Sequence, residues 1–224
     1  MTTTSVPVTP ELHAYILEHC TARDEVQEWL IERTAELGPI ARFQIAPEQG
    51  ILLTMLTRLT QARVAVEIGT FTGYSSICIA RGLADDGKLI CCDISEDWTA
   101  IAREAWRRTG LTDRMDLRIG FALDTINALP QDEHIDLAFV DADKKPYWDY
   151  YSALITRMRP GGIIAFDNVF RRGDVVDSRR AEAGKDGDPD PEALHEFNGR
   201  LAADPRVEVV MLPIADGLTI AQKR

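Results

Sequence analysis

The sequence has 224 residues, of which 45% are hydrophobic and 27% are charged, and this composition is ordinary for a chain that buries a core of its own. The formal net charge of −11 disfavours nucleic-acid binding, which needs a basic surface. No apolar run reaches the roughly 18 residues of a membrane span, and the polar start of the chain lacks the apolar segment of a signal peptide. We therefore expect a cytoplasmic protein that binds neither nucleic acid nor a membrane.

The cysteines show neither metal-ligand nor redox spacing; they are Cys20, Cys78, Cys91 and Cys92. The adjacent pair at 91 and 92 would point to opposite faces of a strand, so the two thiols cannot meet. We interpret all of them as reduced thiols, which agrees with a cytoplasmic location.

Helices are predicted before any strand, and they are opened by capping residues or by first-turn prolines. They are expected at residues 9–20, 24–36 and 47–59. We interpret residues 1–60 as a helical cap and residues 61–224 as an α/β core. Since no linker separates these parts, residues 1–224 are predicted to form a single domain.

From residue 64 onward, strand patterns and helix patterns alternate. Strands are expected at Val64–Ile68, Lys88–Cys92, Met115–Ile119, Ile135–Val140, Gly162–Phe166, Val207–Leu212 and Leu218–Gln222. Helices are expected at Tyr74–Ala84, Asp97–Thr109, Ala122–Leu129, Tyr147–Met158 and Pro191–Ala203. This alternation predicts a doubly wound, Rossmann-like, seven-stranded sheet that is parallel through its first five strands. The link between the last two strands is too short for a helix, so they should form an antiparallel hairpin at one edge.

Two of the predicted strands end abruptly in polar residues. Ile135–Val140 is followed by Asp141 and Lys144, and Gly162–Phe166 is followed by Asp167–Asn168. Because the carboxyl ends of parallel strands meet in one crevice, these oxygen donors should converge, with the lysine beside them. A donor set of carboxylates and an amide, without histidine or cysteine, favours Mg²⁺ or Ca²⁺ over zinc. The sequence therefore predicts a metal site formed by Asp141, Asp167 and Asn168.

The turn after the first strand, Val66–Gly73, is glycine-containing and indicates a nucleotide-like ligand. A dinucleotide-binding turn needs glycine where the backbone meets a pyrophosphate, but Phe71 occupies that position and Glu67 would repel a diphosphate. Asp93, at the end of the second strand, could accept the hydroxyls of a ribose. S-adenosylmethionine (SAM), which carries an ammonium group and an adenosine but no phosphate, suits these residues better.

Ordered motifs in this sequence resemble those of the metal-dependent caffeoyl-CoA and catechol O-methyltransferase family. They are Glu67–Ser75, Phe139–Lys144, Gly161–Gly162 with Asp167–Asn168, and Met211–Thr219. The resemblance covers nearly everything after Phe43, and it implies a class I methyltransferase fold with SAM as cofactor. It also implies a homodimer, because members of the family are commonly dimeric.

The resemblance implies roles for individual positions. The expected SAM contacts are Glu67, Gly69, Tyr74, Ser75, Asp93, Ala122 and Asp141. Lys144 resembles the family's catalytic base, which takes the proton of the acceptor hydroxyl. Tyr147 and Trp148 are aromatic residues at the start of a helix, and we expect them to wall a substrate ring, although most such residues belong to a core.

One departure from the family concerns Arg171, where many relatives carry tryptophan. Arg171 and Arg172, with Arg179 and Arg180 nearby, would make a basic rim on an acidic protein. Arginine is suited to carboxylates and phosphates, so we hypothesise an anionic acceptor, such as an α-hydroxy acyl group on a carrier protein or on coenzyme A. The alternative is a solvated loop whose arginines pair with neighbouring acids.

The leading hypothesis is a SAM-dependent and divalent-cation-dependent O-methyltransferase. Its acceptor would be a molecule with two adjacent oxygens that chelate the cation, either a catechol or caffeoyl-type phenol or the α-hydroxy acyl group. The alternatives are an NAD-binding oxidoreductase of the Rossmann type and a non-catalytic SAM-binding module. The oxidoreductase is disfavoured by Phe71, and the binding module leaves Lys144 beside the metal ligands unexplained.

Overall fold

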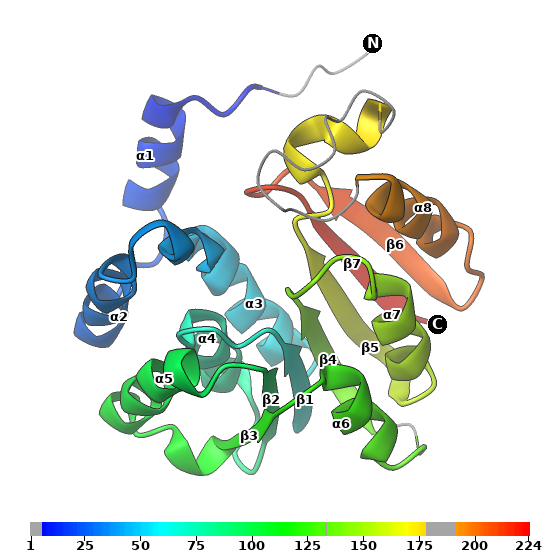
Figure 1. The fold of residues 1–224 in the computed structure, drawn as a ribbon, viewed down its shortest axis with the longest axis horizontal. Helices are drawn as coiled ribbons and strands as arrows, with labels where there is room; N and C mark the ends of the chain where they lie inside the picture. The colour runs from blue at the N-terminus through cyan, green and yellow to red at the C-terminus, as the bar shows by residue number, and fades with distance from the viewer. Residues whose placement is uncertain (1–5, 133, 178–190) are drawn as a thin grey trace.

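The strands form one mixed sheet in this computed structural model, which describes residues 6–132, 134–177 and 191–224 (Figure 1). The strands are β1 Val64–Ile68, β2 Lys88–Asp93, β3 Met115–Ile119, β4 Ile135–Val140, β5 Met158–Asp167, β6 Val207–Leu212 and β7 Leu218–Lys223. Their order across the 7-stranded sheet is β3-β2-β1-β4-β5-β7-β6. Neighbouring strands from β3 to β5 are parallel. The predicted doubly wound α/β fold is confirmed.

The last two strands form the predicted antiparallel hairpin. β7 pairs with β6 on one side and with β5 on the other, and both pairings are antiparallel, so β6 is the edge strand. The short link between the two strands, with Pro213 at its start and Gly217 at its end, leaves no length for a helical crossover, which is the reason for the reversal.

Helices cover both faces of the sheet. They are α1 Pro10–Glu18, α2 Glu25–Ala35, α3 Pro47–Leu59, α4 Tyr74–Gly82, α5 Glu96–Thr109, α6 Ala122–Ala128, α7 Tyr147–Ile155 and α8 Pro191–Ala202. Side chains from α2 to α5 share one hydrophobic cluster with the sheet, and side chains from α6 to α8 share a second cluster on the opposite face. Figure 1 shows these two helical layers on either side of the strands. No helix among the described residues is long and apolar enough to cross a membrane.

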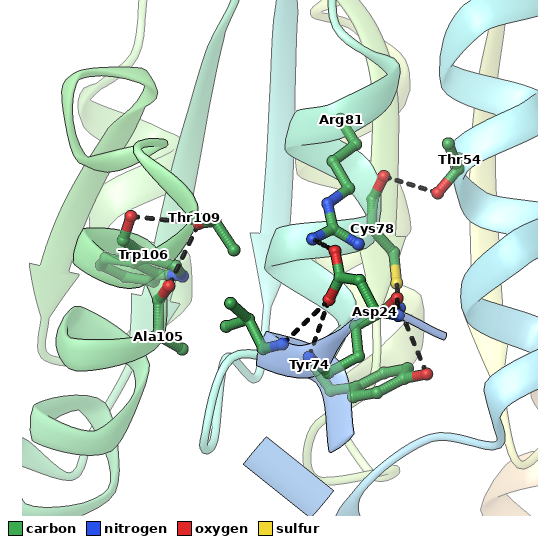
Figure 2. A network of polar contacts seen from close by, with 10 residues as sticks. Asp24, Thr54, Tyr74, Cys78, Arg81, Ala105, Trp106 and Thr109 are labelled. Atoms are coloured by element: carbon green, nitrogen blue, oxygen red, sulfur yellow. Dashed lines mark hydrogen bonds and ion pairs between the residues drawn. The ribbon is translucent and has the colours of Figure 1, made fainter. Parts of the chain in front are cut away.

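The helix α2 is tied to α4 by polar contacts as well as by packing. Asp24 caps α2 and forms an ion pair with Arg81 of α4, as Figure 2 shows. The side chain of Gln27 donates to the hydroxyl of Tyr74 at 3.3 Å. These contacts fix α2 against α4, which is the helix that follows the turn after β1.

The structure departs from the predicted elements at several places. The helix α7 ends at Ile155 and β5 begins at Met158, because β5 pairs with β4 through an irregular register before Leu137. Residues 171–177, expected to be irregular, form a short 3-10 segment interrupted by left-handed backbone. Two further 3-10 segments, Gly38–Phe43 and Thr112–Arg114, were not predicted. Arg179 and Arg180 lie outside the described residues.

Candidate active site

The loops after β1 and β4 meet where the chain reverses its direction of travel across the sheet. β1 lies between β2 and β4, and such a switch point is where open α/β sheets bind ligands. The backbone N–H of Gly69 donates to the carbonyl of Cys92 at 2.9 Å, and that of Asp141 donates to Ile68 at 2.8 Å. A Cβ at Gly69, whose φ is +90°, would lie 2.0 Å from the carbonyl oxygen of Asp141. Glycine is therefore required for this close approach.

Glu67 lies at the carboxyl end of β1 with its side chain fully buried. Neither carboxylate oxygen has a hydrogen-bond partner of normal geometry. Burial raises the pKa of Glu67 to about 8, and the nearby hydroxyls of Ser75 and Thr70 lower the pKa only in part. A buried carboxylate without a partner is costly, so the position suits a ligand that supplies an ammonium or N–H group.

Asp93, at the end of β2, is held by the backbone. Its carboxylate accepts hydrogen bonds from the N–H groups of Thr70 at 3.0 Å, Phe71 at 2.7 Å and Ser95 at 2.8 Å. A carboxylate has about four acceptor sites, so most of them are used to shape the turn after β1. The prediction that Asp93 accepts both ribose hydroxyls therefore needs amendment, because room remains for about one further hydrogen bond.

Tyr74 and Ser75 open α4 at the rim of the crevice. The N-terminus of α4 has no side-chain cap, so its backbone N–H groups can meet a carboxylate. The ring of Tyr74 is buried against the cap, where its hydroxyl accepts from Gln27, so only its backbone can serve a ligand in the crevice. The Ser75 side chain is buried beside Glu67.

Aromatic and apolar residues border the ends of β2 and β3. Phe71 packs edge-on against Trp98, with ring centroids 5.3 Å apart, and its ring fills the place where a dinucleotide turn has glycine. Ala122 is buried at the start of α6, next to Phe121, which is 75% exposed. Ile94, directly after Asp93, is also exposed. Ile94 was not predicted as a residue of this border, because an isolated apolar residue in a loop carries no periodic signal.

The side chain of Lys144 is part of a hydrogen-bond network that links the ends of β4 and β5. Its side chain is buried, and its Nζ donates to Oδ1 of Asp141 at 3.0 Å and to the hydroxyl of Tyr147 at 2.7 Å. That hydroxyl in turn donates to the backbone carbonyl of Asp167 at 2.9 Å. The network fixes the lysine amine between the two strand ends. The neighbouring Lys145 is exposed, as expected for a solvated charge.

Asp167 and Asp141 act on each other electrostatically. Asp167 is 2% exposed, and burial, together with repulsion from Asp141, raises the pKa of Asp167 to about 7. Asn168 follows with a φ of 56°, a left-handed conformation that asparagine tolerates. Among the described residues no third acid, histidine or cysteine joins these carboxylates. These two carboxylates and the amide of Asn168 would make a donor set of the kind that suits a hard cation such as Mg²⁺ or Ca²⁺.

Two of the predicted substrate residues take positions that change their interpretation. Tyr147 is fully buried between Phe166 and Phe197, so its ring supports Lys144 rather than walling a substrate. Trp148 is covered on the outer side of α7 by the guanidinium of Arg200, which lies 3.8 Å from the ring centroid. Arg172 is anchored through its backbone N–H, which donates to Asp216 at 2.6 Å.

Arg171 and Arg172 lie in the segment that follows β5, and both have left-handed backbone, with φ of 51° and 56°. This conformation costs about 1–2 kcal/mol for a residue with a side chain. The two arginines therefore lie close to Asp167 and Asn168 along the chain, in a segment held in a strained shape by the β6–β7 link.

Gln49 is a residue that the sequence analysis missed. It lies in the first turn of α3, it is 0% exposed, and neither of its amide atoms has a hydrogen-bond partner. A glutamine at this helix position is usually interpreted as a capping residue. No side-chain cap is present at this helix, whose N-cap is Ala46. The only signal in the sequence is a buried helix face that contains a polar residue.

Known proteins with similar sequences are O-methyltransferases. The O-methyltransferase family model matches residues 17–224. Caffeoyl-CoA O-methyltransferase 2 from Eucalyptus globulus is 37% identical over 218 residues, which are 95% of this chain and 88% of that protein. A probable caffeoyl-CoA O-methyltransferase from Dictyostelium discoideum is 34% identical over 212 residues, covering 93% of this chain and 90% of the relative.

Solved structures show the same similarity. The O-methyltransferase from Bacillus cereus in complex with SAH has a TM-score of 0.84 at 32% identity, covering 96% of this chain and 97% of that one. The O-methyltransferase TomG from Streptomyces achromogenes, in complex with SAM, has a TM-score of 0.84 at 28% identity, covering 95% of this chain and 96% of that chain.

Proposed function

The chain belongs to the O-methyltransferase family and is a SAM-dependent O-methyltransferase, and from that premise we propose that its acceptor chelates a divalent cation through two adjacent oxygens. The observation that carries this proposal is the pair of repelling acids, Asp141 and Asp167, at the ends of neighbouring strands. Charges of one sign in a buried place are stabilised by an ion of the opposite sign. Asp141, Asp167 and Asn168 would hold that ion.

The cofactor side of the crevice would be formed by the turn after β1. Glu67 would meet the ammonium group of SAM, and the uncapped start of α4 at Tyr74 and Ser75 would meet its carboxylate. Asp93 would accept one ribose hydroxyl, and Ala122 would border the adenine. Gly69 allows the ligand to approach the backbone beside Asp141. SAM, when bound, supplies the methyl group that is transferred.

Lys144 is proposed as the base. Nζ would take the proton of the acceptor hydroxyl, and the acceptor oxygen would then bond to the methyl carbon as the bond from that carbon to the sulfonium sulfur breaks. Asp141 and Tyr147 hold the amine in place from two directions, so it does not have to be ordered when the acceptor arrives. The cation, when bound, favours the deprotonated acceptor and fixes its orientation.

The acceptor is proposed to carry negative charge. Arg171 and Arg172 lie shortly after Asp167 and Asn168 in the chain, and their strained backbone is the kind of feature that concentrates at functional sites. A caffeoyl-type phenol attached to coenzyme A has both the adjacent hydroxyls and the phosphates that arginine binds. An α-hydroxy acyl group on coenzyme A or on a carrier protein offers the same two features, and it is the second candidate.

The experiment is methyl transfer from SAM to a panel of neutral catechols, caffeoyl-CoA and α-hydroxy acyl thioesters, each with Mg²⁺ and with excess EDTA. We expect turnover that chelator abolishes and Mg²⁺ restores, and faster turnover of the anionic acceptors. Full turnover in excess EDTA would refute the role of the cation. Equal turnover of a neutral catechol and its coenzyme A ester would refute the role of the arginines.

Lys144 is tested in the same assay with a neighbour as control. Lys144→Met should lower kcat by about 10²–10⁴-fold, the usual contribution of a positioned base, without changing the affinity for SAM. Lys145→Met removes an exposed lysine one residue away and should leave kcat unchanged. Equal kcat values in the two variants would exclude Lys144 as the base.

A further inference from the structure

Gln49 has an unusual environment. Among the described residues, it shares with Glu67 the property that both polar side-chain atoms are buried and unpartnered. Leaving a buried polar group without a partner costs about 1–3 kcal/mol. Glu67 faces the proposed SAM site, where a ligand would satisfy it. The Gln49 amide likewise needs a polar group within reach.

The packing of α3 indicates which part of the sheet the Gln49 side of the helix faces. Gln49 and Leu53 are four residues apart and so share a face of the helix. Leu53 lies in the same hydrophobic cluster as Leu218 of β7. Leu218 is the partner of Asp167 across the β5–β7 pairing, and directly opposed residues in a sheet point to the same face. Gln49 and Asp167 therefore lie on the sides of α3 and of the sheet that face each other.

The electrostatic interaction between the Gln49 amide and the Asp167 carboxylate agrees with this arrangement. The Gln49 amide lies near enough to the Asp167 carboxylate to stabilise its negative charge. No hydrogen bond of normal geometry is formed between the two side chains. The amide thus lies close to the carboxylate and needs only a small adjustment of either side chain to donate to it.

A purely structural role does not account for Gln49. It does not cap α3, because the helix has no side-chain cap. As a core residue it would be inferior to leucine or methionine, since an apolar side chain of similar size carries no desolvation cost. With Gln49 the free energy of unfolding should thus be lower than with an apolar side chain of similar size at this position.

We propose that Gln49 is a positioning residue for the cation site, whose amide N–H donates to the carboxylate of Asp167 and orients it as a ligand. This inference rests on the proposed function, since it assumes that Asp167 binds a cation. Groups that hydrogen-bond to metal ligands fix the orientation of those ligands, and their loss commonly lowers metal affinity by about 10–100-fold. Gln49 would couple the N-terminal cap directly to the metal site.

The test replaces the amide by an apolar group of similar size, in Gln49→Met. The Mg²⁺ affinity of the protein with SAH is measured by calorimetry, and the free energy of unfolding is measured in urea without metal. We expect Mg²⁺ binding to weaken by about 10–100-fold, while metal-free stability is unchanged or higher. Unchanged Mg²⁺ affinity would overturn the proposal, whatever happens to stability.

The control is Gln27→Met, which alters another buried glutamine of the cap. Gln27 has hydrogen-bond partners, including the hydroxyl of Tyr74, so this variant should lose stability and keep its Mg²⁺ affinity. If both variants weaken Mg²⁺ binding equally, the effect comes from the cap as a whole and the proposal fails. If Gln49→Met does not fold, Gln49→Asn is measured instead; it shortens the arm and should also weaken Mg²⁺ binding.

The two proposals fail in different ways. Wild-type protein that binds no Mg²⁺ and turns over in EDTA contradicts the proposed function itself. Wild-type protein that binds Mg²⁺ with the same affinity as Gln49→Met contradicts only the role of Gln49.

Discussion

Three ionisable side chains near the ends of the central strands are buried. Glu67, Asp167 and Lys144 are all less than a tenth exposed, although each carries a group that prefers water. Lys144 has charged and polar partners, whereas Glu67 has none of normal geometry. The protein without ligands therefore holds at least one acid in an unfavourable environment, and this has a measurable consequence for the dependence of stability on pH.

Glu67 should make the ligand-free protein less stable as the pH rises. The pKa of Glu67 is raised by burial from 4.5 to about 8, so over that interval the folded protein keeps a proton that the unfolded chain has released. The contribution to stability is present below pH 4.5 and is lost as the pH approaches 8. Each pKa unit corresponds to about 1.4 kcal/mol, so the loss should reach a few kcal/mol.

Glu67→Gln removes this titration while keeping the size of the side chain. Urea unfolding of both proteins at pH values near the two limits, about 5 and about 8, should show a smaller loss of stability in the variant. Part of the loss should persist, because the pKa of Asp167 is also raised, to about 7. Equal losses in wild type and variant would show that Glu67 is not desolvated in solution.

At the scale of the element, the loop after β4 lies so close to the loop after β1 that it restricts which residues the loop after β1 can contain. Gly69 combines a left-handed φ with a neighbour that a side chain would strike, the carbonyl of Asp141. Gly110 at the end of α5 has a similar φ of +69° but no atom within 4 Å of its would-be Cβ. Substitutions at these two glycines therefore separate the cost of left-handed backbone strain from the cost of steric overlap.

Gly69→Ala should destabilise the protein by several kcal/mol more than Gly110→Ala. The second substitution should cost only the left-handed strain of about 1–2 kcal/mol, whereas the first must also displace the backbone of Asp141. Thermal or urea unfolding measures both costs. Gly69→Ala should also reduce methyl transfer, since Asp141 adjoins the lysine network. Similar stabilities for the two variants would mean that the loops are farther apart than the structure shows.

For the whole molecule, we propose that the helical cap and the α/β core unfold as one domain. Leu30 of α2 and Leu53 of α3 lie in the same hydrophobic cluster as residues of the sheet. The guanidinium of Arg108 on α5 covers the ring of Trp29 on α2 at 3.9 Å, which adds a further link across the boundary. Residues joined by a shared core lose their packing together.

Urea unfolding should then follow a single transition. Far-UV circular dichroism reports all helices, and tryptophan fluorescence reports both Trp29 in the cap and Trp106 in α5. The two curves should superimpose after normalisation. Separate midpoints, or a fluorescence change that precedes the loss of helix, would show instead that residues 1–60 unfold on their own.

The sequence by itself determined the sheet, the hairpin at its edge and the strand ends at which Asp93, Asp141 and Asp167 lie. These features follow from periodicity, from glycine and proline at turns, and from short links, all of which act over a few neighbouring residues. The family motifs added the chemistry of the site. The short 3-10 segments were not predicted, and the boundaries of elements such as α7 and β5 shifted, because pairing with β4 decides where β5 begins.

The tertiary structure decided which side chains meet. It moved Tyr147 from a supposed substrate wall to the core beneath Lys144, it committed most of the Asp93 carboxylate to the backbone, and it brought Gln49 of the cap toward Asp167. None of these contacts has a local signal, because burial and proximity depend on how distant segments pack. The types of residue at the site could be read along the chain, but their partners exist only after the helices close over the sheet.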